Sequence, residues 1–159
     1  MHQTQKKIKV FIQARFASQR LPGKVMMKIK KEPMIFHVYK KILKLFKPED
    51  IIILTSTSKD DNVIEDFCKQ KKIQVFRGDL SNVGQRYYMA LKYYKCDYFY
   101  RICGDSPLFD TDIFHLFKEK FNQNINFDVI TNFGKKRTFP RGQSLELINS
   151  NTFISNINS

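Results

Sequence analysis

Apolar residues follow two different spacings along the chain. Short runs rich in β-branched and aromatic residues predict five strands, at residues 8–14, 51–55, 73–76, 98–102 and 127–130. Between these runs, apolar residues recur at helical spacing and predict four helices, at residues 34–46, 61–72, 82–95 and 110–121. Pro48 bars continuation of the first helix, and Asp60 or Asp61 is predicted to cap the second.

The predicted strands are apolar on both faces and alternate with helices, which is typical of a parallel sheet covered by helices. The sequence therefore predicts an α/β fold with a doubly wound, mostly parallel sheet, built as one domain over residues 1–159. Alternating character around the FPRG stretch predicts a C-terminal hairpin within residues 133–150. Residues 150–159 begin with a helical pattern that soon stops.

The loops that follow the predicted strands are expected to gather at one edge of the sheet, where open α/β sheets bind ligands. In chain order these loops are ARFASQRLPGK, TSTSKDD, FRGDLSN and CGDSPLFD. They are rich in Gly, Ser and Asp, whereas the loops at the opposite edge, such as FKPED, resemble ordinary connections. This asymmetry predicts a ligand site at the first edge.

Composition narrows the class of protein. No apolar run approaches the roughly 20 residues of a membrane span, and the N-terminal pattern does not fit a signal peptide, so a cytoplasmic protein is expected. The three cysteines, Cys68, Cys96 and Cys103, form no C-x-x-C pair and are expected to be reduced thiols. The net charge of +13 would suit a nucleic-acid partner, but no basic stretch is interleaved with aromatic residues, so no nucleic acid and no membrane partner is expected.

The stretch QARFASQRLPGK places Arg15, Arg20 and Lys24 in one loop with Gly and Pro. Arg offers a bidentate fork and Lys a point charge, so this composition suits phosphate binding. The loop matches neither the P-loop pattern nor the G-x-G-x-x-G dinucleotide pattern. A basic surface turn is the alternative interpretation.

Five blocks in order, A-R-x-x-S-x-R-L-P-G-K, TSTSKDD with VFRGD, NVGQRYYMALKYY, RICGDSPLFD and RTFPRGQSLELI, resemble the sugar cytidylyltransferases. These enzymes activate acylneuraminate or KDO with CTP, and the chain is most similar to the SpsF-like branch of spore-coat polysaccharide biosynthesis proteins. The resemblance covers about residues 8–150. It implies the Rossmann-like fold of nucleotide-diphospho-sugar transferases.

By this resemblance, Arg15 and Lys24 hold the CTP phosphates, and Asp105 binds Mg²⁺, which takes few protein oxygens and shares phosphates. Lys24, Arg15 and Asp105 are thus the implied catalytic residues. The implied nucleotide-binding residues are Ala14, Arg15, Ser18, Arg20, Lys24, Arg77 and Arg86. The alternative for Arg86 is a solvated helix residue, and the alternative for Asp105 is a turn residue or a helix cap.

Two positions depart from the family pattern. In NVGQRYY, Asn82 and Gly84 replace Asp and Leu, and in RTFPRGQSLEL, Ser144 stands where the family commonly has Asp. If residues 144–147 form a strand, Ser144 and Glu146 share a face, and Glu146 is expected to supply the second Mg²⁺ ligand opposite Asp105. The alternative is that Glu146 only pairs with Arg137 or Arg141 across the hairpin.

The implied function is a CTP-dependent nucleotidyltransferase that activates an acylneuraminate-like or KDO-like sugar for surface polysaccharide synthesis, with release of pyrophosphate. Family members continue past residue 150, so the chain is expected to be C-terminally shortened. A homodimer is compatible with the family, but its C-terminal contact region is expected to be missing. The alternative function is a nucleotide-binding module without transfer activity. The acceptor sugar, and CTP rather than UTP, stay open at this point.

Overall fold

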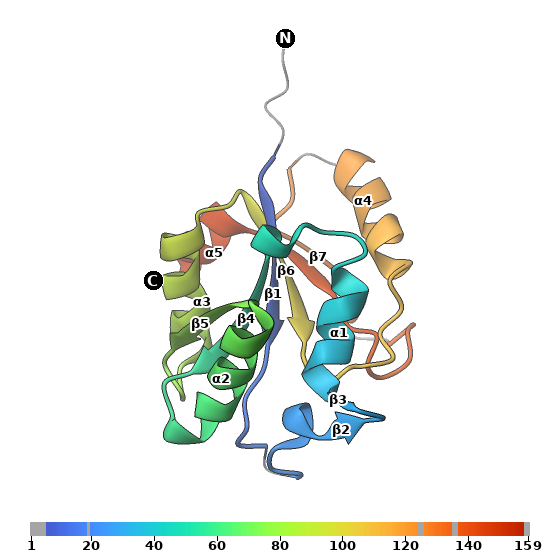
Figure 1. Cartoon of the computed structure of the whole chain (residues 1–159). Coiled ribbons are helices and arrows are strands. Elements are labelled where there is room, and N and C mark those ends of the chain that lie inside the picture. Colours follow the sequence, from blue (N-terminus) through green and yellow to red (C-terminus); the bar gives the residue numbers. More distant parts are fainter. Residues whose placement is uncertain (1–5, 19, 124–125, 135–136, 158–159) are drawn as a thin grey trace.

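In the computed structural model of the chain, the described residues are all except 1–5, 19, 124–125, 135–136 and 158–159. A six-stranded sheet, in the order β5-β4-β1-β6-β8-β7, forms its centre (Figure 1). The strands are β1 (Ile8–Gln13), β4 (Ile51–Ser56), β5 (Gln74–Gly78), β6 (Tyr98–Cys103), β7 (Val129–Thr131) and β8 (Glu146–Asn149). β5, β4, β1 and β6 are parallel, whereas β8 is antiparallel to both β6 and β7. The predicted doubly wound, mostly parallel sheet is confirmed.

Helices cover both faces of this sheet (Figure 1). They are α1 (Met34–Ile42), α2 (Asn62–Lys71), α3 (Val83–Tyr94), α4 (Ile113–Gln123) and α5 (Ser150–Ile157). The buried residues of α1, α2 and α4 pack in one core cluster, and those of α3 pack in a second cluster, to which Phe153 and Ile154 of α5 add. In the described residues, no helix combines the length and the apolar character needed to cross a membrane.

β1 is the central strand, and its side chains alternate between the two cores. Val10 and Ile12 face the α1 side, while Phe11 faces α3 and lies 5.9 Å from Tyr87 and 5.4 Å from Phe99 between ring centroids. All three side chains are fully buried. A strand that is apolar on both faces has to be covered on both faces, and β1 meets this requirement at the centre of the sheet.

Several element boundaries differ from the prediction. The helix predicted over 34–46 ends at Ile42, and the Leu43 side chain that follows is 39% exposed. The strand predicted over 73–76 runs from Gln74 to Gly78, and the helix predicted over 110–121 begins only at Ile113. Unpredicted elements are the short 3₁₀ turns η1 (Lys24–Met26), η2 (Pro48–Asp50) and η3 (Lys59–Asp61) and the ribbon of β2 (Lys28–Ile29) and β3 (Glu32–Pro33).

The predicted C-terminal hairpin is present, but its bounds differ from residues 133–150. Its strands are β7 and β8, which pair antiparallel, and β8 also pairs with β6. The described residues between Thr131 and Glu146 form a long loop without strands. Side-chain hydrogen bonds hold this loop: the Gln143 amide donates to the Leu108 carbonyl at 3.0 Å and accepts from the Asp110 amide at 2.7 Å. Hydrogen bonds from a single side chain such as Gln143 fix the loop without producing a hydrophobic pattern that the sequence could reveal.

The chain reverses its direction of travel across the sheet at β1. It moves outward from β1 to β4 and β5, and then crosses to the other side of β1 to form β6. The carboxyl ends of β1 and β6 therefore lie beside each other, with Gln13 paired to Cys103. Such a switch point is where open α/β sheets leave a crevice for ligands.

Candidate functional site

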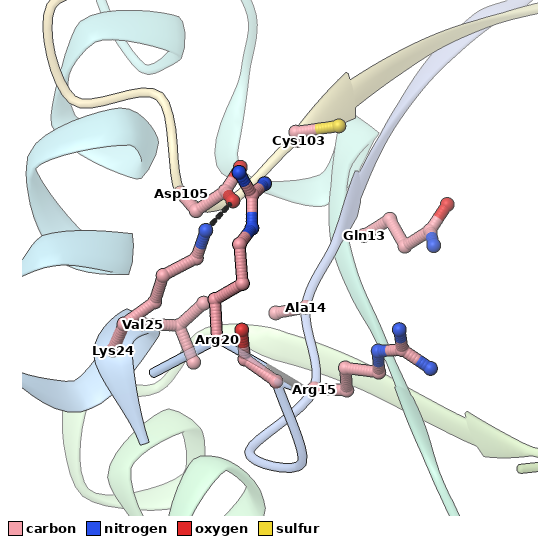
Figure 2. Close-up of a pocket in the computed structure, with 9 residues that line it drawn as sticks. Gln13, Ala14, Arg15, Arg20, Lys24, Val25, Cys103 and Asp105 are labelled. Carbon is pink, nitrogen blue, oxygen red and sulfur yellow. Dashed lines mark ion pairs between the residues drawn. The ribbon is translucent and has the colours of Figure 1, made fainter. Parts of the chain in front are cut away.

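A pocket of about 240 Å³ lies at this switch point (Figure 2). Its lining combines the loop after β1 with the end of β6, and consists of Gln13, Ala14, Arg15, Ser18, Arg20, Lys24, Val25, Cys103 and Asp105. The structure thus brings together most of the residues predicted from the QARFASQRLPGK and CGDSP blocks. Three lining residues were not predicted: Gln13, Val25 and Cys103. Gln13 and Cys103 are the last residues of β1 and β6, and this position was the only sequence signal for them.

The loop after β1 is folded around one peptide group. The Phe16 carbonyl accepts hydrogen bonds from the Ser18 amide at 2.8 Å and from the Gly23 amide at 2.7 Å, which closes the turn. Gly23 has φ +73°, and a Cβ there would lie 2.8 Å from the Phe16 ring, so only glycine fits without strain. The closed turn delivers the chain into η1, which begins at Lys24.

Lys24 and Asp105 form an ion pair across the pocket (Figure 2). Their side chains keep 26% and 33% of their exposure, respectively, so both charges remain accessible to a ligand. The side chain predicted to bind phosphate therefore neutralises the carboxylate predicted to bind metal. A ligand that uses both groups has to separate this pair.

The remaining cations of the loop take different directions. Arg20 extends toward the same end of the pocket as Lys24, whereas Arg15 points away from the Lys24–Asp105 pair (Figure 2). Both arginines are exposed. Ala14 is buried, and its amide donates to the Leu54 carbonyl at 2.9 Å, which ties the start of the loop to β4.

Asp61 does not cap α2 as predicted. Its side chain makes no capping bond to the helix; it turns inward, is 1% exposed, and accepts a 2.6 Å hydrogen bond from the Phe16 amide. It also accepts from the amide and the hydroxyl of Ser56. The Asp60 alternative is wrong as well, because Ser58 caps the preceding turn by accepting from the Asp60 amide.

The hydrogen bonds determine the charge state of Asp61. Burial by itself raises the pKa of this carboxyl, but the bonds from Phe16 and Ser56 outweigh burial and hold the pKa below its usual value. The ionised group therefore stabilises the fold above the ordinary aspartate pKa. That contribution is lost as the pH falls through the lower pKa of the folded state.

Arg77 uses its hydrogen-bond donors on protein groups. It donates to the carbonyls of Ser56 at 2.8 Å and Ser58 at 2.7 Å, and it pairs with Glu65 at 2.5 Å. These contacts join β5 to the loop after β4 and to α2. Arg77 does not line the pocket. Its assignment to nucleotide binding stays a prediction, and its observed contacts support the loops.

Arg86 is not the solvated helix residue that its sequence position allowed. It is 1% exposed, and its guanidinium donates to the Asp79 carbonyl at 2.9 and 2.7 Å and to the Leu80 carbonyl at 3.1 Å. Its Nη1 atom is buried without a hydrogen-bond partner among the described residues. Burial lowers the pKa of this guanidinium, and the nearby Arg15 adds to the shift. Arg86 does not line the pocket, and a direct contact with ligand stays a prediction.

Glu146 pairs with Arg101, its register partner on β6, at 2.8 Å. Neither predicted rival, Arg137 nor Arg141, forms an ion pair in the described part of the chain. Ser144 precedes β8, so the expected shared strand face of residues 144 and 146 is wrong. Arg101 also donates to the Gln13 side chain at 3.4 Å, which links this pair to the pocket wall.

The chain also matches a known protein family over the region that forms the pocket. The family model described as cytidylyltransferase matches residues 9–148, which confirms the resemblance found in the motif blocks. The match includes every residue of the pocket.

Known proteins are similar over most of this chain. The uncharacterized protein MJ1063 of Methanocaldococcus jannaschii is 36% identical over 125 residues, which cover 79% of this chain and 51% of that protein. The spore coat polysaccharide biosynthesis protein SpsF of Bacillus subtilis is 28% identical over 148 residues, covering 90% of this chain and 59% of SpsF. A solved cytidylyltransferase from Leptospira borgpetersenii superposes with a TM-score of 0.87 at 32% identity, covering 96% of this chain and 64% of that one. The chain thus spans only about half to two thirds of their lengths.

Proposed function

The chain belongs to the cytidylyltransferase family, and we propose that its pocket binds CTP and serves the transfer of CMP to an acidic sugar. In this reaction an oxygen of the sugar attacks the α-phosphorus of CTP, the bond to the β-phosphate breaks, and pyrophosphate leaves. The hydroxyl proton passes to solvent. The observation that carries the proposal is a cationic pocket at the switch point of the sheet, where ligands of such folds bind.

The triphosphate is assigned to the side of the pocket that holds Lys24 and Arg20. Lys24 begins η1 directly after the closed turn, so its ammonium group is held at a fixed place rather than on a free loop. A positioned cation contributes to phosphoryl transfer by orienting the phosphates and by neutralising charge on the transferred group. Arg15, which points away from the Lys24–Asp105 pair, stays a proposed phosphate ligand from the other side of the pocket.

The donor set fits Mg²⁺ of the kind that is shared with a substrate. Asp105 offers a partly exposed carboxylate in the pocket, and the described residues contain no cluster of three His, Cys, Asp or Glu side chains that would form an all-protein cage. Mg²⁺ commonly uses one or two carboxylates together with phosphates and water. Asp105 would hold the ion, and Glu146 is proposed as a second oxygen ligand. The bound ion would supply Lewis-acid stabilisation of the phosphate charge.

The acidic nature of the acceptor rests on resemblance. The motif blocks resemble enzymes that activate acylneuraminate or KDO, and the similar protein SpsF is named for polysaccharide biosynthesis. The second candidate is a binding module that holds CTP without transfer. The chain spans 51% and 59% of the lengths of the relatives MJ1063 and SpsF, so transfer activity of the given residues is itself part of the proposal.

A panel of the four nucleoside triphosphates tests the proposal directly. CTP with Mg²⁺ is expected to raise the thermal unfolding temperature more than UTP, ATP or GTP does. At about 100 times its dissociation constant, a ligand stabilises the folded state by about 2.7 kcal/mol. Equal shifts with all four triphosphates would contradict base selection, and no shift with CTP would contradict the nucleotide site. Pyrophosphate release in the presence of an acidic sugar would support the transferase, and CTP binding without this release would support the binding module.

Replacing Lys24 is expected to weaken triphosphate binding. Lys24→Ala should reduce CTP affinity by about 1.5–3 kcal/mol, the range for hydrogen bonds to charged groups. CMP, which lacks the distal phosphates, should lose much less. Isothermal titration with both nucleotides gives the comparison, and Lys28→Ala, an exposed lysine four residues on, is the matched control. Unchanged CTP affinity in Lys24→Ala would favour the alternative interpretation, in which the loop is only a basic surface turn.

A further inference from the structure

The Asp61 carboxylate joins two loops that lie far apart in the sequence. One oxygen accepts from the Phe16 amide, 45 residues away, and the other accepts from the Ser56 amide at 2.9 Å and from the Ser56 hydroxyl. The group is almost completely buried. It is therefore the direct connection between the loop after β1 and the loop after β4.

A carboxylate is the side chain that these surroundings require. Three donors converge on Asp61: two backbone N–H groups and one hydroxyl. An ionised carboxylate accepts at both oxygens, whereas an amide would direct an N–H group at one of these donors. An unpaired buried donor destabilises the structure, so the site discriminates Asp from Asn despite their equal shape.

The Phe16 peptide carries this connection into the pocket. Its N–H group is held by Asp61, while its carbonyl accepts the Ser18 and Gly23 amides that close the turn. Lys24 follows immediately and reaches across the pocket to Asp105. The place of Lys24 therefore depends on a peptide whose orientation is set by a buried carboxylate outside the pocket lining.

We propose that Asp61 is a positioning residue for the phosphate-binding loop, acting through the Phe16 peptide on the turn that ends at Lys24. The identity of the ligand rests on the function proposed above, but the ordering of the loop does not. Asp61 touches neither substrate nor metal in this assignment. Its role is to keep the loop in the conformation that binds a triphosphate, so that little conformational freedom is lost on binding.

The test compares three variants of the full chain. Asp61→Asn keeps the shape of the side chain and removes its charge. Asp60→Asn removes one charge from the adjacent exposed carboxylate, which has no side-chain hydrogen bond or ion pair among the described residues. Ile64→Val trims a fully buried residue of α2 and lowers stability while leaving the hydrogen bonds of Asp61 in place. Hydrogen–deuterium exchange of the free protein, CTP titration with Mg²⁺, and thermal unfolding are measured for each variant.

Asp61→Asn is expected to speed exchange of the Phe16, Ser18 and Gly23 amides by about tenfold, and to weaken CTP binding by about tenfold, the equivalent of one charged hydrogen bond. Exchange in β1 and β6 should stay close to that of wild type. Asp60→Asn should change neither property, and Ile64→Val should lower the unfolding temperature without a selective effect on the loop. Equal losses of CTP affinity in Asp61→Asn and Ile64→Val would overturn the proposal, as would unchanged exchange of the loop amides.

Ser56→Ala provides a milder variant should Asp61→Asn fail to fold. It removes the hydroxyl that donates to Asp61 and accepts from the Ser58 amide at 3.2 Å, keeps the charge of Asp61, and leaves the Phe16 bond in place. A smaller but selective increase in loop exchange is expected, and no increase would count against the proposal. If wild type binds no CTP, the proposed function fails, whereas the exchange experiment still decides the role of Asp61.

Discussion

Asp105→Asn is expected to lower the rate of pyrophosphate release by about 10²–10³-fold, because Asp105 is the proposed Mg²⁺ ligand and a metal ion held there would contribute several kcal/mol to the transition state. CTP should still bind, since the variant frees Lys24 from its ion pair. The measurement is turnover at saturating CTP, together with the Mg²⁺ concentration at the midpoint of CTP-induced thermal stabilisation. That midpoint should rise, so the prediction can be checked without an acceptor sugar.

Two further variants sharpen this result. Asp110→Asn alters another exposed aspartate of the same loop and should leave both readouts unchanged. Glu146→Gln should raise the Mg²⁺ midpoint if Glu146 is the second ligand. A midpoint that moves in Asp105→Asn but not in Glu146→Gln would assign Glu146 to its pair with Arg101 alone. Wild-type turnover in Asp105→Asn would remove Asp105 from the proposed metal site.

Arg86→Met is expected to destabilise the fold by about 3 kcal/mol. The guanidinium is fully buried and donates to the carbonyls of Asp79 and Leu80, so its removal leaves these acceptors without a protein partner. Chemical denaturation measures the loss, and Lys92→Met, an exposed cation on the same helix, is the control. A change below about 1 kcal/mol, with CTP affinity strongly reduced, would instead place Arg86 at the ligand.

The features that depend on local sequence pattern could be predicted from the sequence alone. Strands β1 and β4 are apolar on both faces and were found because a central parallel strand leaves no polar face. The loop containing Arg15 and Lys24 was found because a strand end followed by cations, Ser and Gly has few structural uses. Asp105 followed from the same reasoning, since it comes just after β6.

Features that depend on distant contacts could not be predicted. Asp61 precedes a helix, so its position looked like a cap, and nothing nearby signals a partner 45 residues away. Arg86 lies on a helix position that would normally face solvent, but it packs against Gly78, where a Cβ would lie 2.7 Å from the Arg86 side chain. The pairing of Glu146 with Arg101 depends on the register between β8 and β6, which the loop before β8 determines.

The place of β8 has a consequence for the order in which the chain folds. β6 pairs with β1 on one side, but its other neighbour is β8, 45 residues later at the Arg101–Glu146 pair. During synthesis, β6 therefore has an uncovered edge with free N–H and C=O groups until residues 146–149 have emerged, and such an edge can pair with other chains. Aggregation of chains ended before β8 is thus the expected failure during expression, and it should be relieved once β8 is included.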